Sequence, residues 1–321
     1  MKRVMLFSII AVFAAACAKD EIPIDPIERG QIQESQVNMG QGYIQQVYFS
    51  LENNEIAGTA LYPDWDIAFE NGDAGWRIVL NDAKLMSAWK SPFEEIETAT
   101  DSAGFGPNKT VEVAAQLMEN PAMGDWRNFH GVYLLDLGYN EQGALMGHYW
   151  LQIEAAQPNE YRFRYKKYGE DDVYSGAVSK TGSSAFALYS FAEHREIQTP
   201  SAEAWNIKFS KFTHQFLDPP VDYLVTGVLL NPLNTVAAEL NDRPFQEISA
   251  TDTADIAWSN RPDIIGYNWK FYNFDSGTYE VDQSRSWIIR TASGFYYKFR
   301  FTDFYDETGQ VGVPNFEFAL I

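Results

Sequence analysis

The sequence predicts an all-β protein, mainly antiparallel with few short helices, made of two tandem copies of one β unit. Most of the chain alternates apolar and polar residues with the period of two expected of half-buried strands. Aromatic residues make up 15% of the 321 residues, which suits both β-rich packing and flat binding surfaces. The third observation is a set of motifs that occur twice.

Five short motifs recur in the same order and at similar spacing. They pair residues 48–52 with 189–193, 65–69 with 205–209, 79–81 with 229–231, 93–96 with 245–248, and 161–165 with 297–301. A repeat longer than about 50 residues indicates two domains or two halves of one body, not a short-repeat solenoid. We place the units at 43–170 and 187–321, joined by a linker at 171–186. Duplication predicts that Trp65 and Trp205 are buried at equivalent places.

Strands and hairpins follow from the alternation. Residues 161–165 place aromatic residues on one face and arginines on the other, and residues 297–301 have the same pattern with one lysine. Together with 149–153 and 286–290, which precede them across polar turns, they predict one hairpin in each unit. Helix is expected only at 111–118, where apolar residues have helical spacing before Asn120 and Pro121, and at 235–240. Residues 97–109 read as a loop.

The N-terminus carries a lipoprotein signal. Residues 1–17 contain Lys2 and Arg3, an apolar run and a stretch of alanines before Cys17, the only cysteine. The apolar run is shorter than the ~20 residues that span a bilayer, so it predicts a cleaved signal peptide. Cys17 stands where a bacterial lipobox places the lipid-bearing thiol, so the mature chain is expected to begin there. An ordinary secretory signal with a stray cysteine is the alternative.

The segment after Cys17 predicts a tether and a location. Residues 18–42 contain prolines and glycines and no apolar period, as flexible linkers do. Lys19, Asp20 and Glu21 resemble the short signal that sends lipoproteins of some bacteria to the cell surface, although a solvated linker explains the same charges. We therefore expect a lipid-anchored protein of the outer membrane, exposed at the cell surface.

Charge and missing motifs exclude several functions. The chain has 24 Lys and Arg against 44 Asp and Glu, a net charge of −20. Nucleic-acid affinity comes from phosphate neutralisation by Lys and Arg, so nucleic acid is excluded as a partner. The sequence contains no EF-hand spacing, HExxH, GxSxG or phosphate-binding glycine loop. We therefore predict that the chain is not an enzyme.

Three features of the chain carry a family resemblance. The segment 65–69 (Trp-Asp-Ile-Ala-Phe) is followed closely by a strand that ends in Asn81. The stretch 287–305 closes the second unit, and a lipobox with an acidic tether precedes the first. In these features the chain resembles the HmuY family of bacterial haem-binding lipoproteins. Since they cover both repeats, it resembles a double-unit member of a family whose familiar members have one unit.

The resemblance implies a carrier without catalysis, which captures haem and passes it to a TonB-dependent outer-membrane receptor. It also implies that two axial side chains from the middle of a unit clamp the iron. That middle corresponds to about residues 82–149 in the first unit and 232–285 in the second. The second window contains neither His nor Met and offers only tyrosines as ligands, namely Tyr267, Tyr272 and Tyr279.

The first window therefore supplies the expected ligands. Haem, if bound, should use at least one of His130 and His148, with Met146 or Met123 on the opposite face. His214 follows the second Trp strand, lies outside both windows and is the next choice. For His130 and His148, the roles of ordinary loop and strand residues remain open.

Two other functions also remain open. One is a HmuY-like module that binds protein, peptide or glycan without haem ligation, which the second window favours. The other is a surface hydrolase, for which no nucleophile–base set appears.

Overall fold

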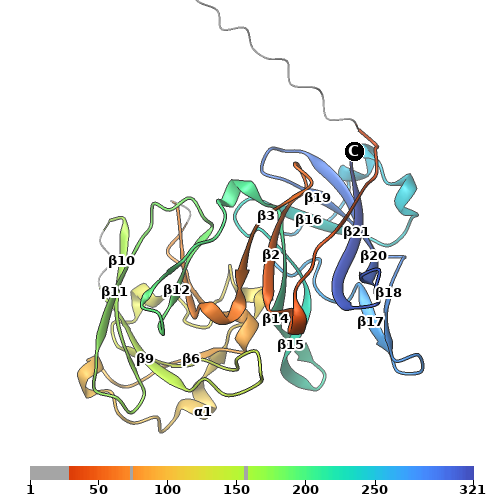
Figure 1. Ribbon diagram of the computed structural model, residues 1–321. Coiled ribbons are helices and arrows are strands. Elements are labelled where there is room, and N and C mark those ends of the chain that lie inside the picture. Colours follow the sequence, from red (N-terminus) through yellow and green to blue (C-terminus); the bar gives the residue numbers. More distant parts are fainter. Residues whose placement is uncertain (1–28, 73–74, 155–157) are drawn as a thin grey trace, which may run out of the picture.

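The computed structural model describes residues 29–72, 75–154 and 158–321, so the signal segment, Cys17 and the start of the tether lie outside the described residues. Two β bodies lie side by side (Figure 1). Every strand pairing in the described ranges is antiparallel. The same ranges contain one α-helix, α1 (Phe105–Asn108). The predicted all-β class is confirmed.

The first body packs two sheets around one core. The strand orders are β13-β12-β4-β5 and β11-β10-β9-β8-β6-β7. The core between them includes Phe69, Leu135, Tyr161 and Phe163, each 1% exposed or less. The strands are β4 (Ile67–Glu70), β5 (Ile78–Leu80), β6 (Ser87–Lys90), β7 (Thr110–Val111), β8 (Val132–Asp136), β9 (His148–Ile153), β10 (Glu160–Lys167), β11 (Tyr174–Ser179), β12 (Phe186–Ser190) and β13 (Arg195–Ile197).

The second body repeats this plan. Its sheets have the orders β15-β14-β2-β3 and β1-β21-β20-β19-β16, and β17 pairs with β18 as a separate ribbon. Phe209, Trp287, Phe299 and Phe316 belong to the core between the two sheets. The strands are β1 (Gln33–Gln36), β2 (Gln45–Ser50), β3 (Glu55–Leu61), β14 (Ile207–Leu217), β15 (Pro220–Leu230), β16 (Val236–Leu240), β17 (Lys270–Asn273), β18 (Thr278–Val281), β19 (Ser286–Arg290), β20 (Tyr296–Tyr305) and β21 (Val311–Leu320).

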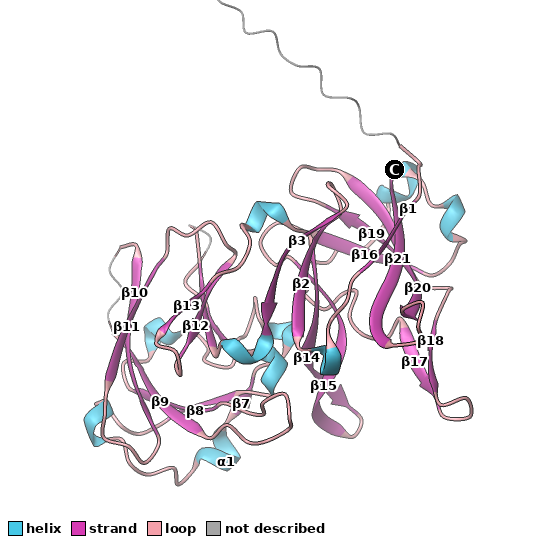
Figure 2. Cartoon of the chain, in the orientation of Figure 1, coloured by secondary structure: helices cyan, strands magenta, loops and turns pink. Residues whose placement is uncertain are grey.

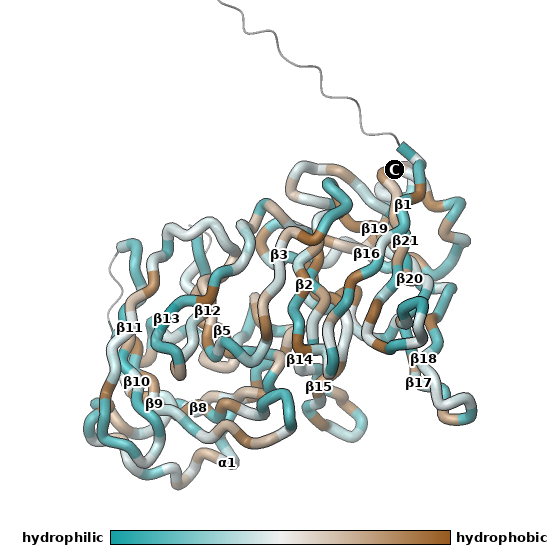
Figure 3. The backbone as a smooth tube through the Cα atoms, viewed as in Figure 1, coloured by the Kyte–Doolittle hydropathy of each residue, from teal (hydrophilic) through white to brown (hydrophobic). Residues whose placement is uncertain are grey.

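Short 3-10 turns link these strands, and Figure 2 shows several of them between the two bodies. None of the described helices is long and apolar enough to cross a membrane. Apolar residues mark strands such as β12, whereas the edge strand β13 is largely polar (Figure 3). The turns are η1 (Gln41–Tyr43), η2 (Tyr62–Asp64), η3 (Asp82–Lys84), η4 (Ile96–Thr98), η5 (Ala114–Gln116), η6 (Trp126–Asn128), η7 (Ala202–Ala204), η8 (Phe245–Glu247) and η9 (Ala250–Thr253).

The bodies exchange hairpins between the two halves of the sequence. The β2–β3 hairpin precedes β4 in the chain but pairs with β14, where Phe49 is opposite Ile207. The β12–β13 hairpin precedes β14 but pairs with β4, where Tyr189 is opposite Ile67. Each body therefore contains strands from both sequence units.

Both exchanged junctions are held by the same asparagine contact. Asn81 Nδ2 donates to the Trp65 carbonyl at 2.8 Å, and Asn231 Nδ2 donates to the Trp205 carbonyl at 3.0 Å. The two tryptophans are 3% and 5% exposed. The occurrence of the same contact at matching motif positions of the two units supports a duplication.

The side chain of the residue after each tryptophan also accepts a backbone N–H in both units. The Asp66 carboxylate accepts the Phe191 N–H, and the Asn206 side-chain oxygen accepts the Leu51 N–H, both at 2.8 Å. Phe191 and Leu51 each follow the first strand of an exchanged hairpin. The second residue of the Trp motif thus fixes the turn of the other unit's hairpin.

The two expected helices do not form. Residues 111–118 divide into the end of β7 and the turn η5, because Glu112 is buried there as the acceptor of the Leu80 and Ala122 N–H groups. Residues 235–240 contain β16, which pairs along its whole length with β19. In both segments, tertiary contacts override a local helical spacing.

Two segments expected to be unstructured connectors contain strands. In the second half of the predicted tether, β1 pairs with β21, and Val37 and Met39 are buried. In the predicted linker 171–186, β11 pairs with β10 as the edge strand of its sheet. Proline and glycine content concealed these short edge strands.

Candidate functional site

The two histidines of the first window lie far apart. Asp136 at the end of β8 is opposite His148 on β9, whereas His130 lies two residues before β8 begins. The four steps of β8 from Val132 to Asp136 alone span about 13 Å, and His130 precedes them. Two axial ligands of one iron lie only about 4 Å apart, taking two bonds of about 2 Å. His130 and His148 therefore cannot bind the same iron.

His148 has the more enclosed position of the two. Its partly buried ring meets Phe105 and Tyr168 edge-on, with centroids at 5.3 and 6.1 Å. Met146 is partly buried against the first core. His130 is exposed on its loop. Of the first-body pair, His148 is the better placed for a flat ligand.

Met123 is packed too deeply to face a ligand. Its side chain is 0% exposed within the first core, and its carbonyl accepts the Tyr133 hydroxyl at 3.2 Å. Reaching an iron would require opening that core. Among the described residues there is also no group of three or more His, Cys, Asp or Glu side chains that could hold a metal ion.

His214 lies on a ribbon that projects from the second body. Strands β14 and β15 stay paired up to Leu217 and Pro220, although β2 pairs with β14 only as far as Phe209. His214 is directly opposite Tyr223, so the two side chains share one face. The His214 ring also contacts Phe216 and Tyr267, with centroids at 4.9 and 4.8 Å.

A carboxylate lies on one side of the His214 ring. Asp263 Oδ2 is 3.9 Å from His214 Nδ1, and Asp263 Oδ1 pairs with Arg261 Nε at 2.6 Å. Histidines that bind a metal commonly direct their second nitrogen toward a carboxylate. This arrangement leaves Nε2 as the His214 nitrogen available to a ligand.

A second ribbon, β17–β18, projects from the same body (Figure 1). We call it and the free part of β14–β15 the aromatic ribbons. Burial raises the pKa of Tyr279 on β18, and the Tyr305, Tyr223 and Tyr272 phenols raise it further. The most exposed large apolar side chains on the ribbons are Leu217 (79%), Val221, Tyr223 (61%), Phe271, Tyr272 and Phe274 (89%).

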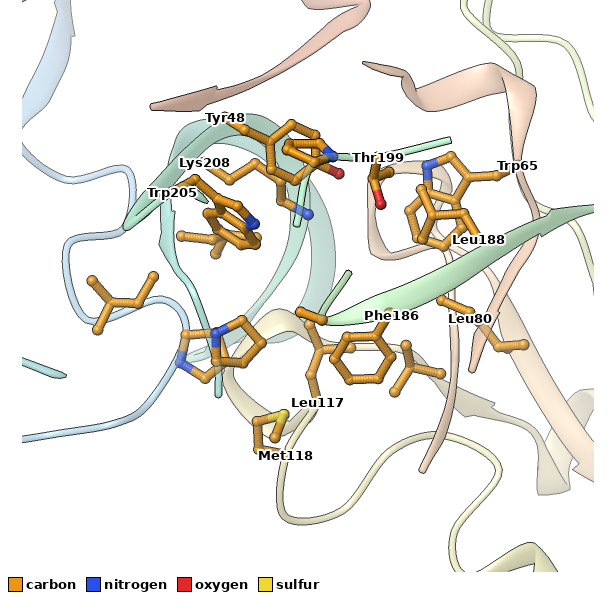
Figure 4. A pocket seen from close by; sticks show the side chains of 18 residues that line it. Tyr48, Trp65, Leu80, Leu117, Met118, Phe186, Leu188, Thr199, Trp205 and Lys208 are labelled. Atoms are coloured by element: carbon orange, nitrogen blue, oxygen red, sulfur yellow. The ribbon is translucent and has the colours of Figure 1, made fainter. Parts of the chain in front are cut away.

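An apolar cleft lies between the two bodies (Figure 4). Trp65 and Trp205 both line it, with Tyr48, Phe186 and Leu117 among their neighbours. The space between its walls is about 670 Å³ with its open mouth included, of which about 70 Å³ is wide enough for the centre of a water molecule. The cleft is therefore a narrow slot. Lys208 is the only charged residue that lines it within the described part of the chain.

The comparison with protein families decides the classification. The family description "HmuY protein" matches residues 42–318. The chain belongs to the HmuY family. One copy of that description runs through both sequence units, whereas the sequence interpretation treated each unit as one family domain. No curated protein matches the chain.

Solved structures similar to this HmuY-family chain include apo PinO from Porphyromonas gingivitis, at 11% identity over 91% of this chain and 97% of that chain, with a TM-score of 0.26. The apo HmuY analog TFO from Tannerella forsythia has 8% identity over 90% and 95%, also with a TM-score of 0.26.

Sequence reasoning missed the ribbons of this HmuY-family member. Leu217, Val221 and Tyr223 belong to a run of alternating apolar residues, which by itself predicts burial. Only the pairing of β2 shows where the sheet ends and the ribbon begins. The Pro219–Pro220 pair at the turn was the available signal for a long hairpin.

Proposed function

We propose that this HmuY-family chain binds haem at the aromatic ribbons of the second body. The observation that carries the proposal is the set of exposed aromatic and apolar side chains on the two ribbons, one of which also carries His214. Soluble proteins rarely expose contiguous apolar patches unless the patches bind something. Haem supplies a flat apolar face for these rings and an iron for a nitrogen or phenol ligand.

His214 is the proposed axial ligand through Nε2. The Asp263 carboxylate lies 3.9 Å from Nδ1, which leaves Nε2 on the other side of the ring for the iron. A tyrosine of the ribbons is the proposed ligand on the opposite face, since tyrosinate is an established haem ligand. Tyr223, which is opposite His214 on the first ribbon, and Tyr279 on β18 are the candidates.

The first-body site, His148 with Met146, is the competing location for the same function. His148 has two edge-on rings around it, of which Phe105 is buried and Tyr168 is 37% exposed. Its exposed neighbour Leu145 and the hydroxyl-bonded Tyr168 belong to separate loops. The two locations predict different spectra for the same substitutions.

A hemin titration of residues 18–321 tests the proposal. The wild type should give a shifted Soret band that saturates at one equivalent. His214→Ala should shift that band or weaken binding about tenfold or more, while His148→Ala and His130→Ala keep the wild-type spectrum.

Each contrary result has a defined meaning. A changed spectrum in His148→Ala alone moves the site to the first body. An unchanged spectrum in all three single variants and in the triple variant removes histidine ligation from the proposal. If the wild type itself gives no Soret shift, haem binding is wrong and a module for protein, peptide or glycan takes its place.

The proposed carrier role also requires a membrane anchor and a receptor that accepts the haem. We propose that Cys17 bears lipid, that the protein sits on the outer membrane facing outward, and that a TonB-dependent receptor accepts the haem. Replacing Cys17 by Ser should release the protein from the membrane fraction. A variant that stays membrane-bound, or a native N-terminus at another residue, would contradict the lipobox.

A further inference from the structure

The cleft between the bodies contains a cation that no described residue neutralises directly. Lys208 lines the cleft from β14, and its side chain is partly buried. Within the described residues its amine makes no hydrogen bond or ion pair, and its one close contact is the Tyr48 ring, with Nζ 6.0 Å from the centroid. Figure 4 shows the Lys208 side chain ending beside the Tyr48 and Trp205 rings.

The nearest opposite charge does not cover this amine. The Asp82 carboxylate favours the charged form of Lys208, yet the two side chains form no ion pair. Asp82 does not line the cleft, and its Oδ2 has no hydrogen-bond partner. Burial lowers the pKa of Lys208, and Asp82 only partly opposes that effect. A buried amine of this kind favours an incoming anion as its partner.

The remaining walls are apolar and close together. Apart from the Thr199 hydroxyl, they consist of aromatic rings, the chains of aliphatic residues and methionine, and prolines, and the Tyr48 and Trp205 rings meet edge-on at 4.9 Å. A slot in which only about 70 Å³ admits the centre of a water molecule is too tight for a broad macrocycle. An unbranched alkyl chain needs only a narrow apolar channel and gains free energy with each buried methylene.

We infer that the inter-body cleft binds a straight-chain carboxylate, with the carboxylate at Lys208 and the alkyl chain between Trp65 and Trp205. The carboxylate would provide the partner that the Lys208 amine lacks. The chain would fill the apolar space that the two bodies leave between them. This site is separate from the aromatic ribbons and does not depend on haem binding.

Calorimetry with dodecanoate tests this inference on residues 18–321. Dodecanoate should bind the wild type at one equivalent, and the uncharged analogue 1-dodecanol should bind about tenfold or more weakly, as expected for the loss of a charge-assisted contact. Lys208→Met should weaken dodecanoate to a similar extent and leave 1-dodecanol unchanged. Lys208→Arg should keep most of the affinity.

Two further variants protect the test from a folding artefact. Lys211→Met is the matched control, because Lys211 lies on the same strand but over the Tyr62 ring, with Nζ 5.1 Å from the centroid, and does not line the cleft. It should bind dodecanoate as the wild type does. Leu117→Trp fills the slot and should abolish binding of both amphiphiles while the thermal transition remains cooperative.

Three results would overturn the inference. The first is absence of dodecanoate binding to the wild type. The second is equal affinity in Lys208→Met, or for 1-dodecanol, which would remove the charge from the recognition. The third is full displacement of dodecanoate by one equivalent of hemin together with weaker hemin binding in Lys208→Met, which would make the cleft a haem site.

Discussion

The two bodies are built on the same strand pair, but that pair extends much further in the second body. In the first body β4 and β5 have 4 and 3 residues, whereas β14 and β15 have 11 each. The part common to both holds the buried tryptophan and its asparagine. The extension, present once, carries His214 and the exposed ribbon face. Features found in both bodies serve packing, and a feature found in one is free to serve binding.

A second difference concerns charge at the matched positions. In the first body Lys84 Nζ pairs with Asp66 Oδ1 at 2.9 Å, and the lysine side chain is fully buried. In the second body the corresponding residues are Asn206 and Asn234, both uncharged. Both arrangements hold an exchanged hairpin, since the Asp66 and Asn206 oxygens each accept a turn N–H. The ion pair is therefore one of two solutions to the same structural task.

The largest expected effect comes from separating the two sequence halves. Residues 29–170 alone contain β4 without β12 and β2 without β14, so both bodies lose a central strand pairing. This fragment should show no cooperative unfolding and little near-UV circular dichroism. Adding residues 171–321 should restore both signals and give a 1:1 complex in size-exclusion chromatography. A fragment that folds cooperatively alone would show that the exchange is dispensable.

Removing the cation from the charged junction should be strongly destabilising. Lys84→Met leaves the Asp66 carboxylate buried without its partner, which typically costs about 3–5 kcal/mol of unfolding free energy. The double variant Asp66→Asn with Lys84→Met makes this junction uncharged, as the second one is, and should recover most of that loss. Urea unfolding measures both. If the double variant is no more stable than the single one, the two junctions are not interchangeable.

The bodies should also respond to pH in opposite directions. In the first body, burial raises the pKa of Glu112 to about 8, against backbone N–H groups that lower it. Glu112 is 0% exposed, and the folded state keeps its proton where the unfolded state has lost it. Its contribution to stability is therefore complete below about pH 4.5 and is lost as pH rises to about 8.

Lys270 in the second body should change stability with pH in the opposite direction. Burial lowers its pKa to about 7 from 10.5, so its contribution is complete above about pH 10.5 and is lost as pH falls toward 7. A tenfold change in proton affinity is worth about 1.4 kcal/mol. The pH-dependent contribution of Glu112 or of Lys270 to the unfolding free energy is therefore roughly 3–5 kcal/mol. Urea unfolding across pH should lose the falling slope in Glu112→Gln and the rising slope in Lys270→Met. If a variant and the wild type show the same dependence of unfolding free energy on pH, that residue does not cause the slope assigned to it.

The sequence predicted the parts of the fold that depend on local pattern. Residues 161–165 and 297–301 lie within β10 and β20, and each is joined to the strand expected before it. The partner of each hairpin could not be predicted, because β4 and β14 carry nearly the same motif and the local pattern does not tell which hairpin each one pairs with. Loop lengths and the rest of the core decide that choice, and neither appears as a local pattern.

The candidate site depended on the same missing information. His130 and His148 were both candidates because they lie in the same window, but the register of β8 and β9 puts them at opposite ends of a strand. The thioether of Met123 could ligate iron by its chemistry, but the side chain is buried in the core. His214 was identified as an alternative, but its aromatic surroundings come from Tyr223 and Tyr267 through strand pairing and loop packing.

The smallest expected difference separates the two tryptophans themselves. Truncating either Trp65 or Trp205 to Ala should cost about 3–5 kcal/mol, because both are large buried aromatics. Replacement by Phe keeps most of that packing and isolates the indole N–H. Trp65 Nε1 donates to Gln46 Oε1 at 2.9 Å, and Gln46 is itself 0% exposed and bonded to Ser210. Trp65→Phe therefore leaves a buried amide oxygen without its donor, which costs about 1–3 kcal/mol.

Trp205→Phe breaks no such contact, since the edge-on ring of Tyr48 is the partner that the structure gives its side chain. We expect Trp65→Phe to be about 1 kcal/mol more destabilising than Trp205→Phe in urea unfolding. Gln46→Leu in the Trp65→Phe background should remove that difference, because it takes away the unsatisfied oxygen together with its lost donor. Equal costs for the two Phe variants would mean that the Gln46 bond adds nothing to the first junction, and that its asymmetry with the second lies in charge alone.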